Sequence, residues 1–251
     1  MKRGVLSGAV APVRVLWSPG RALDDALVHR VVAPASLVLL ISALGALALP
    51  RLLAALGVAL QPTGRALLDA HLGVLGVGLR RLLLFERLVF PLPFLAGASV
   101  LWMVAAPALS GRRVTSGQVA ALLVLGTAPL LVQRCGELAV VLAAPAADLG
   151  ASDVAALPAR FNVGVAGALA AAGVSAPGWL GVAAEAASGV GAWVVALWGW
   201  GLARLDRDAA RSAGASRALW WCVVAAAAYA AGWALYAACY PTLLLLVMGA
   251  S

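Results

Sequence analysis

The sequence predicts an all-α protein, a polytopic membrane helix bundle with five transmembrane helices and additional amphipathic helices at the N-terminus and between the spans. The first observation is composition: 64% of the 251 residues are hydrophobic and 11% are charged, against about 45–50% and about 25% in soluble domains. The second is that the apolar residues gather in runs of about 20 residues, the length that crosses the hydrocarbon core. The third is that the arginines fall between these runs, where basic residues set membrane topology.

These runs divide the chain into two parts. Residues 1–30 form a basic cytoplasmic tail that contains an amphipathic helix, and residues 31–250 form a single transmembrane domain. The predicted spans cover about 31–49, 88–109, 119–144, 181–203 and 219–248.

The tail carries a helix start at Ser18-Pro19. Serine suits the N-cap, and proline suits the first helical position because it has no N–H to leave unsatisfied. Asp24 and Asp25 lie early in this helix, where negative charge complements the helix dipole. Its narrow apolar stripe fits a helix lying on the membrane surface, and it fits equally well a helix packed on the end of the bundle.

The first span is expected to end at Pro50-Arg51, and two later segments are harder to assign. Residues 65–87 are apolar at helical spacing but contain four basic residues and two acidic ones, so they predict either an interfacial helix or a poor sixth span. Five spans leave a clear excess of Lys and Arg on the N-terminal side, whereas six divide them almost equally, so the positive-inside rule favours five. Within 146–180, the apolar run 161–173 is too short to span and indicates a surface-lying or re-entrant helix.

The third span carries the polar residues Gln133, Arg134 and Glu137. A charged side chain at the bilayer centre costs roughly 2.5–3.5 kcal/mol, so it usually faces the protein interior and has a partner. Arg134 and Glu137 are three residues apart and can pair on one helix face. Pro129 should kink the helix where this cluster begins. The cluster is either a structural lock or part of a pathway.

Metal, cofactor and catalytic sites are not expected. His29 and His71 are isolated, and Cys135, Cys222 and Cys239 lie in apolar segments without CxxC spacing, which predicts buried, unreactive cysteines. No GxSxG or HExxH motif is present. The arginines do not form the basic stretches with interleaved aromatics that bind nucleic acid, so the chain is not expected to bind it.

Six arginines are predicted to contact lipid headgroups or a protein partner on the N-terminal side of the membrane. Each Lys or Arg near an anionic leaflet adds about 1 kcal/mol of binding. The expected partners are the bilayer, anionic headgroups, and a membrane-protein partner or a second copy of the chain. The six are Arg112, Arg113, Arg204, Arg207, Arg211 and Arg217.

Three stretches together are similar to a known family. The first, RVLWSPGRALDDAL, precedes the first span. The second, ALSGRRVTSGQVAALLVLGTAPLLV, contains Gly111, Thr115, Gln118 and Pro129, and its Ser116 is a candidate helix cap. The third is LPARFNVGVAGAL followed by GAWVVALWGWGLARL. They resemble the Yip1-domain family of bacterial membrane proteins. The resemblance implies five spans, a cytoplasmic N-terminus and no enzymatic activity.

The leading functional hypothesis is therefore a non-enzymatic scaffold or adaptor in the cell membrane, with the N-terminus in the cytoplasm and the C-terminus on the opposite side. The alternative is a small transporter or permease subunit that uses Gln133, Arg134 and Glu137, because broken helices with polar groups at depth form substrate sites. A third hypothesis, an intramembrane enzyme, lacks a recognisable nucleophile and base.

Overall fold

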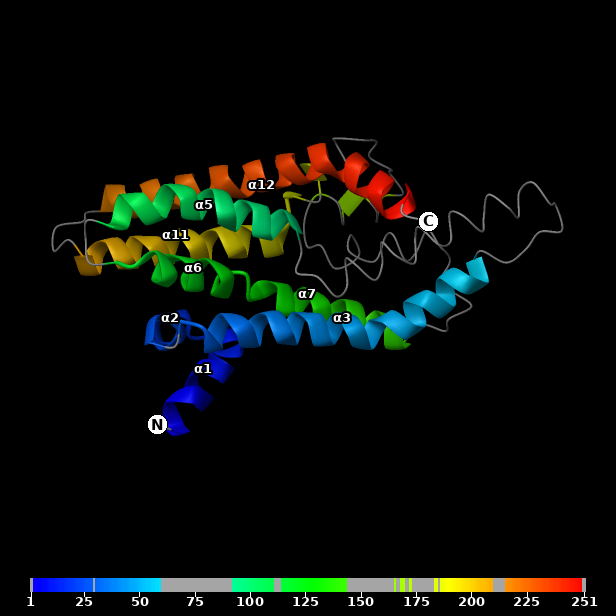
Figure 1. The fold of residues 1–251 in the computed structure, drawn as a ribbon, viewed down its shortest axis with the longest axis horizontal. Helices are drawn as coiled ribbons and strands as arrows, with labels where there is room; N and C mark the ends of the chain where they lie inside the picture. Colours follow the sequence, from blue (N-terminus) through cyan, green and yellow to red (C-terminus); the bar gives the residue numbers. More distant parts are fainter. Residues whose placement is uncertain are drawn as a thin grey trace.

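The long helices of the described chain lie side by side along one axis (Figure 1). The structure, a computed structural model, describes residues 2–28, 30–59, 92–110, 114–143, 165, 168–169, 172, 183–184, 186–209 and 215–249. These residues form helices and turns and no β-strand. Within the described residues, the helices are α1 (Lys2–Arg14), α2 (Pro19–Val28), α3 (Val32–Ala59), α5 (Leu92–Ser110), α6 (Ser116–Leu125), α7 (Pro129–Ala143), α11 (Gly189–Ala209) and α12 (Ala215–Gly249).

Helices α3, α6–α7 and α12 run in one direction along the long axis, and α5 and α11 run in the other (Figure 1). One end of the bundle therefore holds α2, the turn before α6, the end of α11 and the start of α12. We call this the basic end, because Arg21, Arg30, Arg204 and Arg217 lie there. The end at which α3 and α7 finish and α11 begins is called the far end.

Four helical stretches are long and apolar enough to cross a membrane: Val32–Arg51, Leu92–Ser110, Ser116–Ala143 and Ser216–Cys239. They correspond to the first, second, third and fifth of the five predicted spans. Helix α11 lies where the fourth was expected, but it begins at Gly189 instead of residue 181 and carries Arg204 and Asp206 near its end. These helices identify the chain as a membrane protein.

Helix α11 is the centre of the bundle. It packs against α12 and also contacts α5, α6 and α7, while α3 packs on α7 and α6. Its inward face is fully or nearly fully buried at Val194, Trp198 and Leu202. A helix that contacts protein on several sides exposes less of its surface to lipid than the helices around it. It can therefore carry glycine and tryptophan at positions where a lipid-facing helix would carry leucine.

Helices α5 and α12 make the closest contact of the bundle. A side chain on Gly232 would lie 2.6 Å from the Pro93 carbonyl oxygen and 2.6 Å from the Gly97 Cα. Phe94 on α5 meets Tyr229 and Trp233 of α12 edge to face, with ring centroids 5.6 and 6.2 Å apart. Small residues that let two backbones approach are the usual basis of helix association in membranes.

The N-terminal region differs from the predicted tail, because residues 2–14 form helix α1. Ala11 and Val15 are buried, and α1 packs against α3 and α2. Helix α2 begins at Pro19, as its sequence predicted. Its buried Ala22 and Leu23 lie on the side that contacts α6 and α3, so α2 packs on the end of the bundle.

The first candidate span ends at Arg51, as predicted, although α3 itself contains Pro50 and continues to Ala59. Two local predictions are corrected. The N-cap of α6 is Thr115 and not Ser116. The cysteines are not buried: Cys135 and Cys239 are exposed and Cys222 is partly exposed, because an apolar residue of a membrane helix can face lipid instead of protein. Residues 65–87 and the interhelical segment 146–164 lie outside the described residues.

Candidate functional site

The third membrane stretch is interrupted between α6 and α7. Thr115 begins α6 with a capping box: its hydroxyl accepts from the Gln118 N–H, and the Gln118 side chain accepts from the Thr115 N–H at 2.9 Å. Helix α6 ends at Leu125, a turn covers 126–128, and α7 starts at Pro129. Proline has no N–H to donate to the Leu125 carbonyl. The Ala128 N–H donates to it instead, at 3.0 Å.

This tightened turn frees a backbone carbonyl, and a side chain from another helix satisfies it. In an α-helix the Thr127 N–H would donate to the Leu123 carbonyl. Here it donates to the Val124 carbonyl at 3.1 Å, which leaves the Leu123 carbonyl without this donor. The fully buried Trp198 of α11 donates its indole Nε1–H to that carbonyl at 2.7 Å. Gly126 makes room for the ring, since a Cβ there would lie 2.8 Å from the indole nitrogen. The break is therefore anchored to α11.

The polar cluster lies on α7, one turn beyond the break. Arg134 Nη1 lies 2.7 Å from Glu137 Oε2, and Gln133 Nε2 donates to Glu137 Oε1 at 3.3 Å. The Glu137 side chain is 2% exposed and the Arg134 side chain 12%. Both carboxylate oxygens thus accept hydrogen bonds from the same helix, which is the arrangement that lowers the cost of a buried charge.

Helix α7 is also held at its far end. Arg51 of α3 donates to the carbonyls of Leu142 at 2.7 Å and Val141 at 3.4 Å. The last carbonyls of a helix have no partner within it, and a cation near them is favourable to the helix dipole. Trp198 therefore holds the end of α6, just before the break, and Arg51 holds the end of α7, the helix that carries the cluster.

At the basic end, an ion pair and a hydrogen bond join parts of the chain distant in sequence. Arg204 of α11 lies 2.8 Å from Asp24 of α2, and its guanidinium group is 5.7 Å from the ring centroid of Trp200. Arg30 donates to the Thr115 hydroxyl at 3.2 Å. Together these contacts join the N-terminal helices to the ends of α6 and α11.

The basic end also contains a buried acidic residue, Asp206. Asp206, 2% exposed, accepts from the indole Nε1–H of Trp221 at 3.0 Å and pairs with Arg217 at 3.4 Å. A carboxylate at a helix C-terminus is disfavoured by the helix dipole. The contacts from α12 compensate this cost and join α11 to α12.

Of the six arginines predicted to contact lipid or a partner, the structure describes the side chains of Arg204 and Arg217. Each is paired with a carboxylate of this chain. Arg112, Arg113 and Arg211 lie outside the described residues, and of Arg207 only the backbone is described. The pairing of Arg204 with Asp24 was not foreseen, because nothing in the sequence links two residues 180 positions apart.

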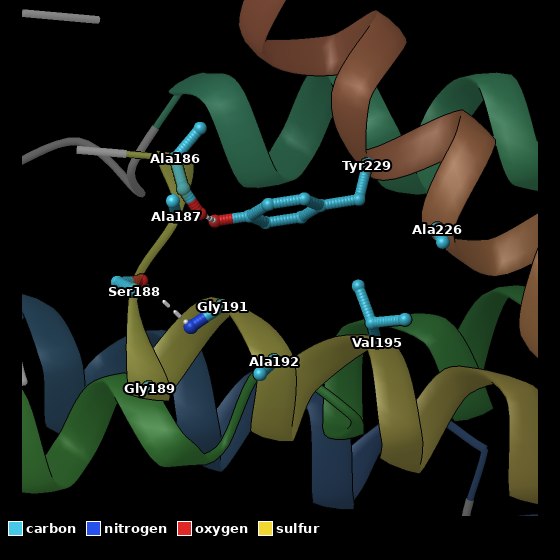
Figure 2. A pocket seen from close by; sticks show the side chains of 9 residues that line it. All are labelled: Ala186, Ala187, Ser188, Gly189, Gly191, Ala192, Val195, Ala226 and Tyr229. Carbon is cyan, nitrogen blue, oxygen red and sulfur yellow. Dashed lines mark hydrogen bonds between the residues drawn. The ribbon is translucent and has the colours of Figure 1, made fainter. Parts of the chain in front are cut away.

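One further feature was missed in the sequence. A pocket of about 490 Å³ lies between the start of α11 and the middle of α12, with Ser188 and Tyr229 in its lining (Figure 2). Among the described residues, no three His, Cys, Asp or Glu side chains are grouped so that they could hold a metal ion. Comparison with protein-family models, curated proteins and solved structures finds no match to this chain.

Proposed function

We propose that this protein is a non-enzymatic scaffold or adaptor in the cell membrane, with five spans and a cytoplasmic basic end, as its resemblance to the Yip1-domain family implies. The observation that carries this proposal is the joining of α2 to the bundle by Arg204 and Asp24. That contact places α2 and the end of α11 on one surface at the basic end. A surface assembled from distant segments and rich in arginine is suited to anionic headgroups and to an acidic partner.

Helix α11 is the fourth span in this proposal. Its 21 residues extend about 32 Å at 1.5 Å per residue, close to the thickness of the hydrocarbon core. Near its end, Arg204 pairs with Asp24, and Asp206 pairs with Arg217 and accepts a hydrogen bond from Trp221. With this helix counted, the alternating directions place the N-terminus and the C-terminus on opposite sides of the membrane.

Photo-crosslinking in cells tests the adaptor function. A photoreactive amino acid replaces Arg21, an exposed residue of α2 at the basic end; the matched control replaces Ala143, which is exposed at the far end. We expect a discrete cross-linked protein from position 21 and none from position 143. Equal diffuse labelling from both positions would contradict a docking surface at the basic end.

The transporter alternative is supported by one observation, the helix break immediately before a buried charged cluster. Replacing Arg134 and Glu137 together by leucine separates the two functions. If the protein is a scaffold, the double variant keeps the cross-link from position 21 and supports growth as the unchanged protein does. If it is a transporter, the double variant no longer supports growth, although the cross-link and the protein level are unchanged.

A further inference from the structure

The pocket between α11 and α12 has a buried floor and an exposed rim. Ser188, Gly191 and Tyr229 are buried at the floor, and small side chains from both helices are exposed at the rim (Figure 2). The opening therefore lies on the side of the bundle, between two neighbouring helices. The lining residues are Ala186, Ala187, Ser188, Gly189, Gly191, Ala192, Val195, Ala226 and Tyr229.

The floor is held in a fixed shape. The Tyr229 hydroxyl donates to the Ala186 carbonyl at 3.0 Å, and its ring packs edge to face with Phe94 and Trp198, with centroids 5.6 and 6.5 Å apart. Gly191 lies under the ring, and a Cβ at this position would overlap the Tyr229 hydroxyl. The pocket is thus largely preformed, as ligand sites usually are.

The chemistry of the lining selects an apolar ligand. None of the described residues that line the pocket has a charged side chain. Both of its hydroxyls have internal partners: Ser188 Oγ accepts from the Gly191 N–H at 2.8 Å, and Tyr229 donates to Ala186. A charged or strongly polar ligand would lose its hydration here without new hydrogen bonds. The remaining surface consists of alanine, glycine, valine and an aromatic ring.

The position of the pocket opening along α11 and α12 indicates which molecules can enter the pocket. Tyr229 and Ala226 lie in the middle of the candidate span Ser216–Cys239. The same two helices expose Val223 (55%) and Trp193 (38%), large apolar residues that face lipid in a membrane. The pocket is therefore open to the hydrocarbon layer, where acyl chains are the surrounding medium.

We propose that the pocket binds one acyl chain of a bilayer lipid, which enters sideways between α11 and α12 and lies against the ring of Tyr229. The pocket has a volume of about 490 Å³ and is wide open along its rim, which fits an acyl chain that keeps one side in the bilayer. This inference rests on α11 and α12 spanning the membrane, as proposed above, but not on the adaptor role.

A photoreactive lipid tests the proposal. The full-length protein is reconstituted in phosphatidylcholine vesicles containing a trace of phospholipid with a diazirine in one acyl chain, irradiated and digested. We expect adducts concentrated on the peptides that contain Val195 and Tyr229. Replacing Ala226 by tryptophan fills the pocket and should reduce these adducts to the level found on other lipid-facing residues.

Ala227→Trp is the matched control, because Ala227 is exposed on the same helix but does not line the pocket. It should leave the adducts unchanged. Ala192→Leu narrows the opening from α11 and provides a second test if Ala226→Trp does not fold, as judged by size-exclusion chromatography.

Two results would overturn the proposal. One is adducts spread evenly over the exposed residues of α12 and unaffected by Ala226→Trp and Ala192→Leu. The other is a pocket that is not labelled, in a protein that is a dimer and that Ala226→Trp converts to a monomer. That result would show that a second copy of the chain occupies the pocket. Failure of the adaptor function leaves the lipid labelling intact, so the two proposals are tested separately.

Discussion

At the scale of single residues, Glu137 shows how a membrane helix carries charge. Its carboxylate accepts hydrogen bonds from Gln133 and Arg134 of the same helix. The sequence predicted the pairing of Arg134 with Glu137, because residues three apart share a helix face and the geometry is local. The pairing of Glu137 with Arg134 favours a structural role for the cluster, which the next prediction tests.

Glu137→Leu should destabilise the protein more than the double replacement of Arg134 and Glu137 by leucine. The single change leaves Arg134 buried without this carboxylate, which costs about 3–5 kcal/mol for a broken buried pair, whereas replacing both partners is close to neutral. Thermal unfolding in detergent measures both variants. Ala139→Leu, at an exposed position of the same helix, is the control and should not change the melting temperature. Equal losses in the single and double variants would show that the pair does not act as a unit.

Trp198→Phe should destabilise the bundle by about 1–2 kcal/mol, because the Leu123 carbonyl loses its indole donor and stays buried. Trp193→Phe provides the comparison, since Trp193 is 38% exposed and should be nearly neutral. Denaturant titration of the two variants in detergent gives the difference. Losses of the same size would mean that ring packing, and not the hydrogen bond, carries the contribution of Trp198.

At the scale of the helices, small residues decide which pairs come into close contact. Gly232 and Gly97 bring α12 against α5, and Gly199 brings α11 against α12, because a Cβ there would lie 2.7 Å from the Cys222 Cα. The sequence shows many small residues in every span. It does not show which of them face a neighbour, because composition carries no information about the rotation of a helix about its axis.

Gly232→Ala should weaken the α5–α12 contact and destabilise the protein by about 1–3 kcal/mol, the usual cost of overpacking. The added methyl group meets backbone atoms of Pro93 and Gly97, which cannot rotate away as a side chain can. Ala234→Leu, at an exposed position of α12, adds more volume without this conflict and should be neutral. Retained stability in Gly232→Ala would show that the two helices separate at little cost.

Arg204→Ala should loosen α2 without unfolding the bundle. The Asp24 carboxylate is 55% exposed and the Arg204 side chain 34%, so the ion pair contributes about 0.2–1 kcal/mol and weakens in high salt. Hydrogen–deuterium exchange of residues 19–28 should therefore become faster while exchange in α11 stays slow. Exchanging the two charges, with Asp24→Arg and Arg204→Asp together, should restore protection. Arg21→Ala is the control, and equally fast exchange in that variant would contradict a specific role for the pair.

At the scale of the whole molecule, the sequence predicted the class of fold and the positions of most spans. Hydrophobicity, segment length and the placement of arginine are sufficient for that, and four of the predicted stretches are candidate membrane-crossing helices. Helix α1 was missed because Gly4, Gly8 and Pro12 weaken its helical pattern, while packing on α3 stabilises it. The contacts Arg204–Asp24 and Trp198–Leu123 depend on tertiary packing, so the linear pattern contains no trace of them.

The orientation of the whole molecule can be tested with reporter fusions. Alkaline phosphatase, which is active only outside the cytoplasm, should be inactive when fused after Ser212 and active when fused after Ser251. A reporter that requires the cytoplasm should give the reverse result. The same side for both positions would remove α12 from the set of spans, and an active fusion at Ser212 with an inactive one at Ser251 is the result expected if α11 does not span. Either result would contradict the five-span arrangement.

The central position of α11 has a consequence for how the protein is made. Helix α11 leaves the ribosome after α5, α6 and α7, and yet all three contact it. Until it is inserted, the Leu123 carbonyl lacks the indole that satisfies it and the earlier helices surround an incomplete interior. These helices therefore enter the bilayer before their contacts with α11 can form, and the bundle closes only after α11 is inserted. Mutations that weaken the hold on α11 should act first as biogenesis defects, lowering the yield of inserted protein more than the stability of the molecules that mature.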